Sequence, residues 1–242
     1  MLTRNPTLTE QVRAHIKELI LQGEFEDGRI PGEQDLAAEL GVSRTTVRDA
    51  MARLENEGAV LRRQGSGTYV NEPGLQIKSR LEEIWSYEDV LHNHGFTPSV
   101  KILGITSEAA GDDAAAALEI EADAEVTVIR KLFLADEEPV IYTCNRIPGQ
   151  YLDAGIAETD TEPLFTLLRE HTGHQPAYYL TEIAPVAMPD DAATALQIDP
   201  GTPTICFDEV LFGTLSEPVA HARSYFRDDL LRFRVIRRRA DV

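Results

Sequence analysis

Hydroxyl and guanidinium side chains, which donate hydrogen bonds to polar and anionic partners, gather at the start of one short predicted helix. Ser43, Arg44, Thr45 and Arg48 occur within a few residues of one another. In a helix over residues 43–54 they lie within the first two turns. A helix that enters the major groove presents such donors to base edges and to flanking phosphates. The spacing therefore predicts a DNA-reading helix.

Two helical patterns on either side of a short turn would position these donors. Residues 33–40 and residues 43–54 each repeat apolar residues at helical spacing, and Gly41-Val42-Ser43 lies between them. Each pattern gives its helix a single apolar stripe, so we expect the two helices to share a core. The stripe of the second helix consists of Val47, Ala50 or Met51, and Leu54.

A small hairpin is predicted directly after the second helix. Residues 60–63 read as a strand, residues 64–67 as a turn and residues 68–70 as the return strand. The glycine-rich tip lets the backbone approach a phosphate or the minor groove, and Arg62 and Arg63 stand beside it. Either feature alone would suit an ordinary surface helix or hairpin, but together they favour a winged helix-turn-helix.

The stretch from about residue 8 to residue 70 resembles the DNA-binding domain of the GntR family of bacterial transcription regulators. The segments that carry the resemblance are IPGEQDLA, LGVSRTTVRDAM and RRQGSGTYV. The family usually has arginine after the glutamate of its Pro-x-Glu-Arg motif, whereas this chain has Gln34, which brings no charge to that contact. The expected DNA-binding residues are Glu33, Gln34, Ser43, Arg44, Thr45, Thr46, Arg48, Arg62, Arg63, Gln64, Gly65 and Gly67.

The chain is strongly acidic, with a net charge of −18 over 242 residues. Residues 1–75 carry 9 Lys or Arg against 12 Asp or Glu, a net of −3, and residues 76–242 carry 14 against 29, a net of −15. The arginines of the predicted DNA reader can therefore still form a local positive face. No signal peptide or membrane span is recognisable, so we expect a cytoplasmic protein. Cys144 and Cys206 lie in apolar runs and are expected to be buried free thiols.

An internal repeat occupies much of the remaining chain. A linker is predicted at residues 73–79, where Pro-Gly interrupts the preceding pattern. Beyond it, residues 111–140 align with residues 189–219, including an Asp-Asp-Ala-Ala segment and the Glu-Pro-Val that follows the turn. Each copy reads as a capped short helix, a long strand, a turn and a second strand. Two copies predict a sheet with internal pseudo-twofold symmetry.

Residues 80–242 resemble the UTRA effector-binding domain of the HutC subfamily of GntR regulators. The segments that carry this resemblance are EDVLHNHGFTPS, LADEEPVIY and RSYFRDDLLRFRV. It implies an α+β protein, in which a winged helix-turn-helix domain over residues 1–72 precedes a mostly antiparallel, chorismate-lyase-like sheet with flanking helices. It also implies a homodimer that binds palindromic double-stranded operator DNA and releases it when a small organic effector binds, with no cofactor.

Polar side chains within the apolar strand runs are the candidates for the effector site. Relatives that bind phosphosugars have basic residues at the positions of Lys131 and Phe133, so the resemblance implies an effector with an apolar part beside an anionic group. The expected effector-binding residues are Lys131, Phe133, Asn145, Glu209, Arg223 and Tyr225. For each of them a place on the solvated face of the sheet is the alternative. Lys131 and Glu209 occupy equivalent repeat positions, which suits either an asymmetric ligand or a structural ion pair.

A regulator, an enzyme and a purely architectural DNA-binding protein are the three main classes that these features allow. A regulator needs a DNA reader and a ligand pocket, and both are predicted. An enzyme would need convergent catalytic groups, and the sequence offers no activated nucleophile, metal-ligand set or phosphate loop, so we expect neither catalysis nor a metal. A metabolite-binding domain with residual lyase-like activity is the alternative, because fold alone does not decide function. A purely architectural DNA-binding protein would not need a duplicated sheet.

Overall fold

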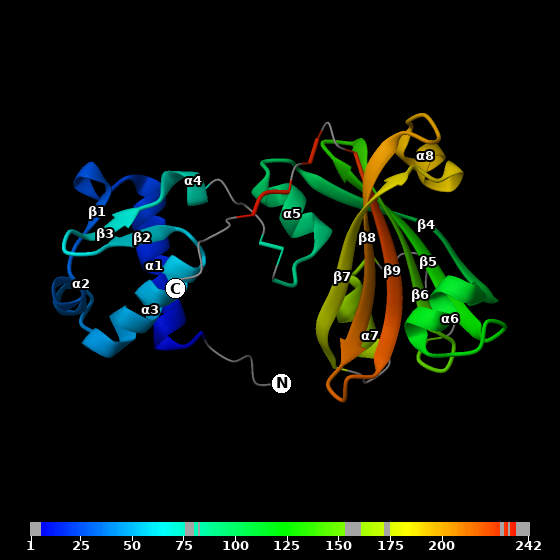
Figure 1. Ribbon diagram of the computed structural model, residues 1–242, viewed down its shortest axis with the longest axis horizontal. Helices are drawn as coiled ribbons and strands as arrows, with labels where there is room; N and C mark the ends of the chain where they lie inside the picture. Colours follow the sequence, from blue (N-terminus) through cyan, green and yellow to red (C-terminus); the bar gives the residue numbers. More distant parts are fainter. Residues whose placement is uncertain are drawn as a thin grey trace. The chain divides into compact units, whose positions relative to one another are not determined.

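The computed structural model describes residues 6–75, 80–81, 83–152, 161–171, 175–227, 230–231 and 233–235. These residues form two compact units. The N-terminal unit extends to Arg80 and also includes Arg234, and the C-terminal unit spans Leu81–Phe233. Figure 1 labels the helices and strands of both units. None of the described helices is long and apolar enough to cross a membrane.

The N-terminal unit combines helices with a small sheet. Its elements are α1 (Leu8–Gln22), the short 3-10 helix η1 (Glu26–Gly28), β1 (Arg29–Ile30), α2 (Glu33–Leu40), α3 (Arg44–Asn56), β2 (Val60–Arg63), β3 (Gly67–Val70) and α4 (Glu72–Leu75). The three strands form an antiparallel sheet in the order β1-β3-β2. The predicted winged helix-turn-helix is confirmed, and β1 adds a strand that the sequence did not predict.

Local capping sets the ends of these helices. Thr7 and Glu10 form a reciprocal capping box at the start of α1. Ser43 caps α3 by accepting a hydrogen bond of 3.1 Å from the backbone N–H of Thr46. Gly41 ends α2 with a φ of 65°, in the left-handed region that glycine adopts without strain. The chain therefore turns sharply between α2 and α3.

One core unites the apolar stripes of α1, α2 and α3. The stripe predicted for α3 is buried, and both alternatives for its middle position, Ala50 and Met51, belong to it. Full burial of such a side chain stabilises the fold by roughly 1.5–3 kcal/mol, so this core holds α3 firmly against its neighbours. The buried members of the core are Val12, Ile16, Ile20, Ile30, Leu36, Val47, Ala50, Met51, Leu54, Ala59 and Val60.

The N-terminal unit extends further along the chain than the predicted boundary at residue 72. Glu72–Leu75 form the one-turn helix α4, and Gly74 within it is buried. A Cβ atom at Gly74 would lie 1.9 Å from the carbonyl oxygen of Gly58, so only glycine fits there. The Asn71 side chain donates a hydrogen bond of 2.7 Å to the same carbonyl. Of the predicted linker, residues 76–79 lie outside the described part of the chain.

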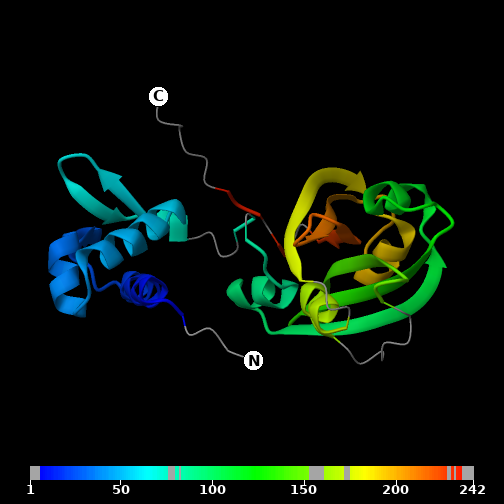
Figure 2. The same ribbon diagram turned by 90° about the horizontal axis from the view of Figure 1, so that it is seen from below.

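The C-terminal unit is built around a six-stranded antiparallel sheet in the order β4-β5-β6-β9-β8-β7. Two copies of a strand-helix-strand-strand unit, β4-α6-β5-β6 and β7-α8-β8-β9, meet at β6 and β9, which confirms the predicted pseudo-twofold repeat. Figure 2 shows the bend and twist of its strands. Its elements are α5 (Tyr87–Asn93), β4 (Pro98–Ala109), α6 (Gly111–Leu118), β5 (Glu125–Ala135), β6 (Glu138–Pro148), α7 (Leu164–His171), β7 (Pro176–Ala187), α8 (Asp190–Leu196), β8 (Pro203–Gly213) and β9 (Pro218–Phe226).

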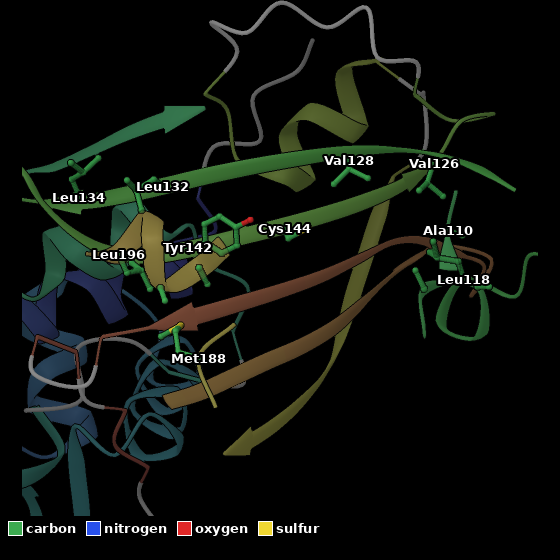
Figure 3. Close-up of a cluster of buried hydrophobic side chains, with 14 residues drawn as sticks. Ala110, Leu118, Val126, Val128, Leu132, Leu134, Tyr142, Cys144, Met188 and Leu196 are labelled. Atoms are coloured by element: carbon green, nitrogen blue, oxygen red, sulfur yellow. The ribbon is translucent and has the colours of Figure 1, made fainter. Parts of the chain in front are cut away.

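Helices α6 and α8 cover one face of this sheet. Helix α6 packs on β9 and α8 packs on β6, so each copy of the repeat covers a strand of the other copy. In Figure 3, Leu196 of α8 belongs to the same cluster as Leu132 and Tyr142 of the strands. The two copies therefore share one hydrophobic core.

The repeated Asp-Asp segment also joins the two copies. Asp113 of α6 pairs with Arg223 of β9, with 3.0 Å between Oδ2 and Nη1. Asp191 of α8 accepts a hydrogen bond of 2.8 Å from the hydroxyl of Tyr142 on β6. The second aspartate of each segment thus ties its helix to the opposite half of the sheet, which gives this part of the repeat a structural role.

Helices α5 and α7 lie on the other face. Val90 and Leu91 of α5 pack with Phe133 and Phe207 of the sheet. The buried side chains of α7 pack with a separate group of strand residues that includes Ile129. The sheet is therefore the middle layer of three, and its α5/α7 face is the one that carries the cavity described below.

Candidate functional site

Glu33, the first residue of α2, brings the second helix and the wing together. Its carboxylate lies 3.4 Å from Nε of Arg44 and 3.7 Å from Nη2 of Arg62. Arg62 also pairs with Glu55 at 3.0 Å. The starts of α2 and α3 and strand β2 thus meet at one edge of the N-terminal unit, and this edge gathers the residues expected to contact DNA.

The polar side chains at the start of α3 either cap the helix or extend into solvent. The hydroxyls of Ser43 and Thr46 lie 2.8 Å apart and form the N-terminal cap of α3. Thr45, Arg48 and Arg44 are exposed, and the side chain of Arg44 is 72% exposed. The side chains of these three residues are therefore accessible to a partner.

The wing tip has a fixed shape. Gly65 and Gly67 have φ values of 74° and 117°, where only glycine is free of strain. The guanidinium carbon of Arg63 lies 4.4 Å above the centre of the Tyr69 ring. The hydroxyl of Tyr69 lies 2.8 Å from Oγ of Ser66. These contacts orient one wing arginine beside the glycine-rich tip before any DNA is bound.

Arg29 is an exposed basic residue at this edge, and the sequence analysis did not identify it as a candidate DNA contact. It pairs with Tyr69 through the two-residue strand β1, and its Nε would lie 3.6 Å from a Cβ atom at Gly67. A strand this short has no periodicity to reveal it. Gln34 and Gln64, which were expected in the interface, are both exposed.

A cavity of about 280 Å³ lies within the C-terminal unit, over the α5/α7 face of the sheet. Strand pairing aligns the side chains of this face in two rows that run across five strands. The first row consists of Lys131, Thr143, Ser224, Phe207 and Ile183, and the second of Ile129, Asn145, Ala222, Glu209 and Thr181. All of these side chains line the cavity.

The structure brings together four of the six residues expected to contact an effector. These four are Lys131, Phe133, Asn145 and Glu209. Arg223 and Tyr225 do not join them, because alternation along β9 turns both toward α6 and α8, whereas Ala222 and Ser224 face the cavity.

On that opposite face both residues have structural partners. Arg223 pairs with Asp208 at 2.8 Å as well as with Asp113, and these carboxylates raise the pKa of its guanidinium further, against the opposing effect of burial. The Tyr225 ring lies 6.3 Å from the ring of Tyr142, centre to centre. Their expected place in the effector site is therefore corrected.

Lys131 is the one lysine among the described residues that line the cavity, and its side chain is engaged. The residue is 4% exposed, and its Nζ donates a hydrogen bond of 2.5 Å to the backbone carbonyl of Glu162. Burial raises the pKa of the neighbouring Glu88 carboxyl, and the charge of Lys131 partly offsets that rise. The ammonium group of Lys131 is thus stabilised by a hydrogen bond to a carbonyl and by its attraction to a carboxyl group.

Glu209 lies in the same wall with hydroxyl partners. Thr181 donates a hydrogen bond of 2.7 Å to its Oε1, and the Tyr87 hydroxyl is a second donor. Burial raises the pKa of Glu209, the two donors lower it in part, and the charge of nearby Asp208 adds to the rise. Within the described part of the chain, no lysine, arginine or histidine forms an ion pair with Glu209.

Several cavity residues escaped the sequence analysis. Thr181 and Phe207 follow from strand alternation once the pairing of β7 and β8 is known. Tyr87 comes from α5, and no pattern in the sequence connects that helix to the sheet. Cys144 and Cys206 are buried free thiols, as predicted. No group of three or more His, Cys, Asp or Glu that could hold a metal occurs among the residues for which the structure gives positions.

Family models match both units. The model of bacterial regulatory proteins of the gntR family matches residues 8–70. The model of the UTRA domain matches residues 93–232, more than half of the chain.

Similar proteins include named repressors. The HTH-type transcriptional repressor NagR of Bacillus subtilis (strain 168) is 24% identical over 224 residues, which cover 92% of this chain and 91% of NagR. The histidine utilization repressor of Pseudomonas putida is 30% identical over 193 residues, which cover 77% of this chain and 72% of that protein.

Two solved structures share the fold. That of the possible transcriptional regulator YydK from Bacillus subtilis has a TM-score of 0.74 at 18% identity and covers 96% of this chain and 100% of YydK. PhnF from Mycobacterium smegmatis has a TM-score of 0.58 at 23% identity and covers 94% of this chain and 99% of PhnF. The family matches and the 30% identical repressor establish that this protein belongs to the GntR family of bacterial transcriptional regulators and carries a UTRA domain after its winged helix-turn-helix.

Proposed function

We propose that this protein is a cytoplasmic transcriptional repressor that releases its operator when a small organic effector occupies the cavity of the C-terminal unit. The observation that carries the proposal is the cavity itself, whose wall combines aromatic and aliphatic surface with buried polar side chains such as Lys131 and Asn145. Cavities of this composition are typical of small-molecule sites. The names of the two similar repressors support the direction of control.

The exposed edge of the N-terminal unit would bind the operator. Arg44, Thr45 and Arg48, which are exposed, would read base edges in the major groove, and Arg62 and Arg63 would bind phosphates beside the wing. Base contacts give the sequence preference, whereas phosphate contacts give affinity for any duplex.

The proposal includes a homodimer on a palindromic operator, because two identical reading heads related by a twofold axis match two identical half-sites. Sedimentation of the full-length protein at micromolar concentration should give the mass of two chains. Footprinting should give two protected half-sites about one helical turn apart. A monomer that protects a single half-site would contradict this part.

Regulation needs no catalysis, so we propose that the C-terminal unit binds its metabolite without converting it. The alternative of a residual lyase-like activity can be tested directly. The purified protein is incubated with chorismate, and the mixture is analysed by chromatography over several hours. Turnover above that of a heat-denatured sample would favour the alternative.

An operator-release experiment tests the role of the cavity. A thermal-shift screen of metabolites, with and without operator DNA, first identifies compounds that bind. Lys131→Met removes a positive charge from the cavity wall, so it should change the concentration needed for release by about tenfold, upward for an anionic compound and downward for a cationic one, which corresponds to about 1.4 kcal/mol of binding free energy. Operator affinity without the compound should stay at the value of the parent protein.

Two variants serve as controls. Lys101→Met makes the same chemical change at an exposed position of the edge strand β4. Arg223→Ala alters the face of the sheet away from the cavity. Both should be released at the same compound concentration as the parent. If Lys131→Met behaves like Lys101→Met, the effector does not bind in this cavity.

A further inference from the structure

The cavity contains more acidic than basic side chains. Its ionisable lining residues are Glu83, Glu88, Glu162, Glu209 and Lys131. Glu83 and Glu162 are exposed, so among the described lining residues two partly buried carboxyl groups, those of Glu88 and Glu209, accompany one buried ammonium group. A ligand that enters this space exchanges water for that set of charges, so the sign of the charge it carries matters to its affinity.

The single ammonium group already has partners of its own. Lys131 donates to the Glu162 carbonyl at 2.5 Å and interacts with the carboxyl of Glu88. An anionic ligand would have to replace these contacts, and it would meet the remaining carboxyl groups as like charges. The cavity wall therefore offers an anion little net attraction.

Glu209 differs from Lys131 because its partners carry no charge. The hydroxyls of Thr181 and Tyr87 donate to its carboxylate, but they supply no positive charge to balance it. The nearest acidic neighbour, Asp208, is itself paired with Arg223 and His221 on the other face of the sheet. A partly buried carboxylate of this kind gains most from a cationic partner.

Aromatic rings surround the space beside Glu209. The rings of Tyr87 and Phe133 lie 5.1 Å apart, centre to centre, in an edge-to-face arrangement. Tyr179 and Phe207 line the same cavity from β7 and β8. Such rings pack well on an apolar body, and their faces also attract cations.

We infer that the effector carries a protonated nitrogen, such as an amine or amidine, that binds Glu209, joined to an apolar or aromatic body that packs against the surrounding rings. This inference rests on the proposed function, since it names the class of molecule that occupies the same cavity. It replaces the anionic group implied by the sequence resemblance with a cationic one.

Three probes that differ in one polar group test this inference on the full-length protein. Benzylamine, benzyl alcohol and benzoate share an aromatic ring and carry a cation, a neutral hydroxyl and an anion. Their affinities are measured by ligand-observed NMR titration at millimolar concentrations. Benzylamine should bind at least about tenfold more tightly than benzyl alcohol, and benzoate should bind most weakly.

Glu209→Gln should abolish the preference for benzylamine over benzyl alcohol. The matched control is Glu182→Gln, the same change at an exposed β7 position that pairs with Asp208 on the opposite face. This control should retain the preference. Equal affinities for the amine and the alcohol, tighter binding of benzoate, or no detectable binding of benzylamine would each overturn the inference.

A pH titration of the unmodified protein gives a second test that needs no variant. Because the pKa of Glu209 is raised, benzylamine should bind more tightly as the pH rises and this carboxyl loses its proton. Tyr87 of α5, Tyr179 of β7 and Asp208 of β8 interact with Glu209, and Glu88 of α5, whose pKa burial also raises, lines the same cavity. Ionisation of either glutamate favours a bound cation, so the expected direction is the same. The two tyrosines have pKa values raised above 10 and Asp208 a value lowered from 3.8, so neither type changes charge between pH 5 and 8. An affinity that is constant or falls over this range would contradict the inference.

Failure of the inference can be separated from failure of the proposed function. If only anionic metabolites bind in the cavity and release the operator, the inference is wrong and the proposed function stands. If a compound bound in the cavity leaves operator affinity unchanged, the proposed function is wrong, whatever the charge of that compound.

Discussion

Replacement of Glu33 by glutamine should make the protein a tighter and less selective DNA binder. The Glu33 carboxylate pairs with Arg44 at the start of α3 and with Arg62 of the wing. DNA phosphates compete for the same two guanidinium groups and are repelled by the carboxylate. Glutamine keeps the size of the side chain but removes the charge, so both arginines become available to any duplex.

The exposure of the partners sets the size of the effect. The side chains of Arg44 and Arg62 are 72% and 44% exposed, and an exposed ion pair contributes about 0.2–1 kcal/mol. Two such pairs correspond to about 0.4–2 kcal/mol, or roughly a two- to thirtyfold gain in affinity for scrambled DNA. The operator should gain less, because Glu33 also orients Arg44 for base reading. One fewer negative charge should also steepen the salt dependence by about one phosphate contact.

Fluorescence anisotropy with labelled operator and scrambled duplexes, over a series of salt concentrations, measures both quantities. Glu39→Gln is the matched control, because Glu39 is an exposed residue of the same helix that forms no ion pair with another described residue. If Glu39→Gln raises the affinity for scrambled DNA as much as Glu33→Gln, net charge explains the gain. If Glu33→Gln binds scrambled DNA no more tightly than the parent, the carboxylate does not restrain the arginines.

Further predictions concern base reading, the core and pH. Arg44→Ala should cost about 1–3 kcal/mol at the operator and relax specificity at one base pair, whereas Arg62→Ala should weaken binding to all duplexes; operators mutated one position at a time distinguish the two effects. Leu54→Ala should lower the free energy of unfolding in urea by about 2–5 kcal/mol, because Leu54 is fully buried, while Leu61→Ala, at a 40% exposed position, should change it little. Because burial raises the pKa of Glu209 above 4.5, its ionisation should reduce stability as the pH rises from about 4.5 through the folded-state pKa. Glu209→Gln should flatten that fall in thermal unfolding, and a slope equal to that of the parent would contradict the assignment.

The N-terminal fold could be predicted because its signals are local. Ser43 is the N-cap of α3, and Gly41 ends α2 in the left-handed backbone conformation. The apolar stripe of α3 follows helical spacing, so the residues of a short segment are enough to predict both helices. Strand β1 could not be predicted in this way. It consists of two residues and exists only through pairing with β3, far along the chain.

The cavity shows a different limit. Alternation along β5 correctly places Lys131 and Phe133 on one face, because a single strand fixes the relation between its own residues. The relation between β5 and β9 depends on the pairing of both strands with β6, which no segment of the sequence contains. Arg223 was therefore assigned to the wrong face on its chemical type alone. Tyr87 was missed because tertiary packing alone brings α5 to the cavity.

The duplicated sheet also bears on how ligand preference can evolve. In a homodimer with a site on its symmetry axis, every substitution appears twice, and the site must recognise both ends of a ligand in the same way. Here the two halves belong to one chain, and equivalent positions hold Lys131 in the first copy and Glu209 in the second. Each end of the cavity can thus mutate independently. Fusion of two copies into one chain therefore allows a site with two different ends, which can recognise two different groups at the ends of one ligand.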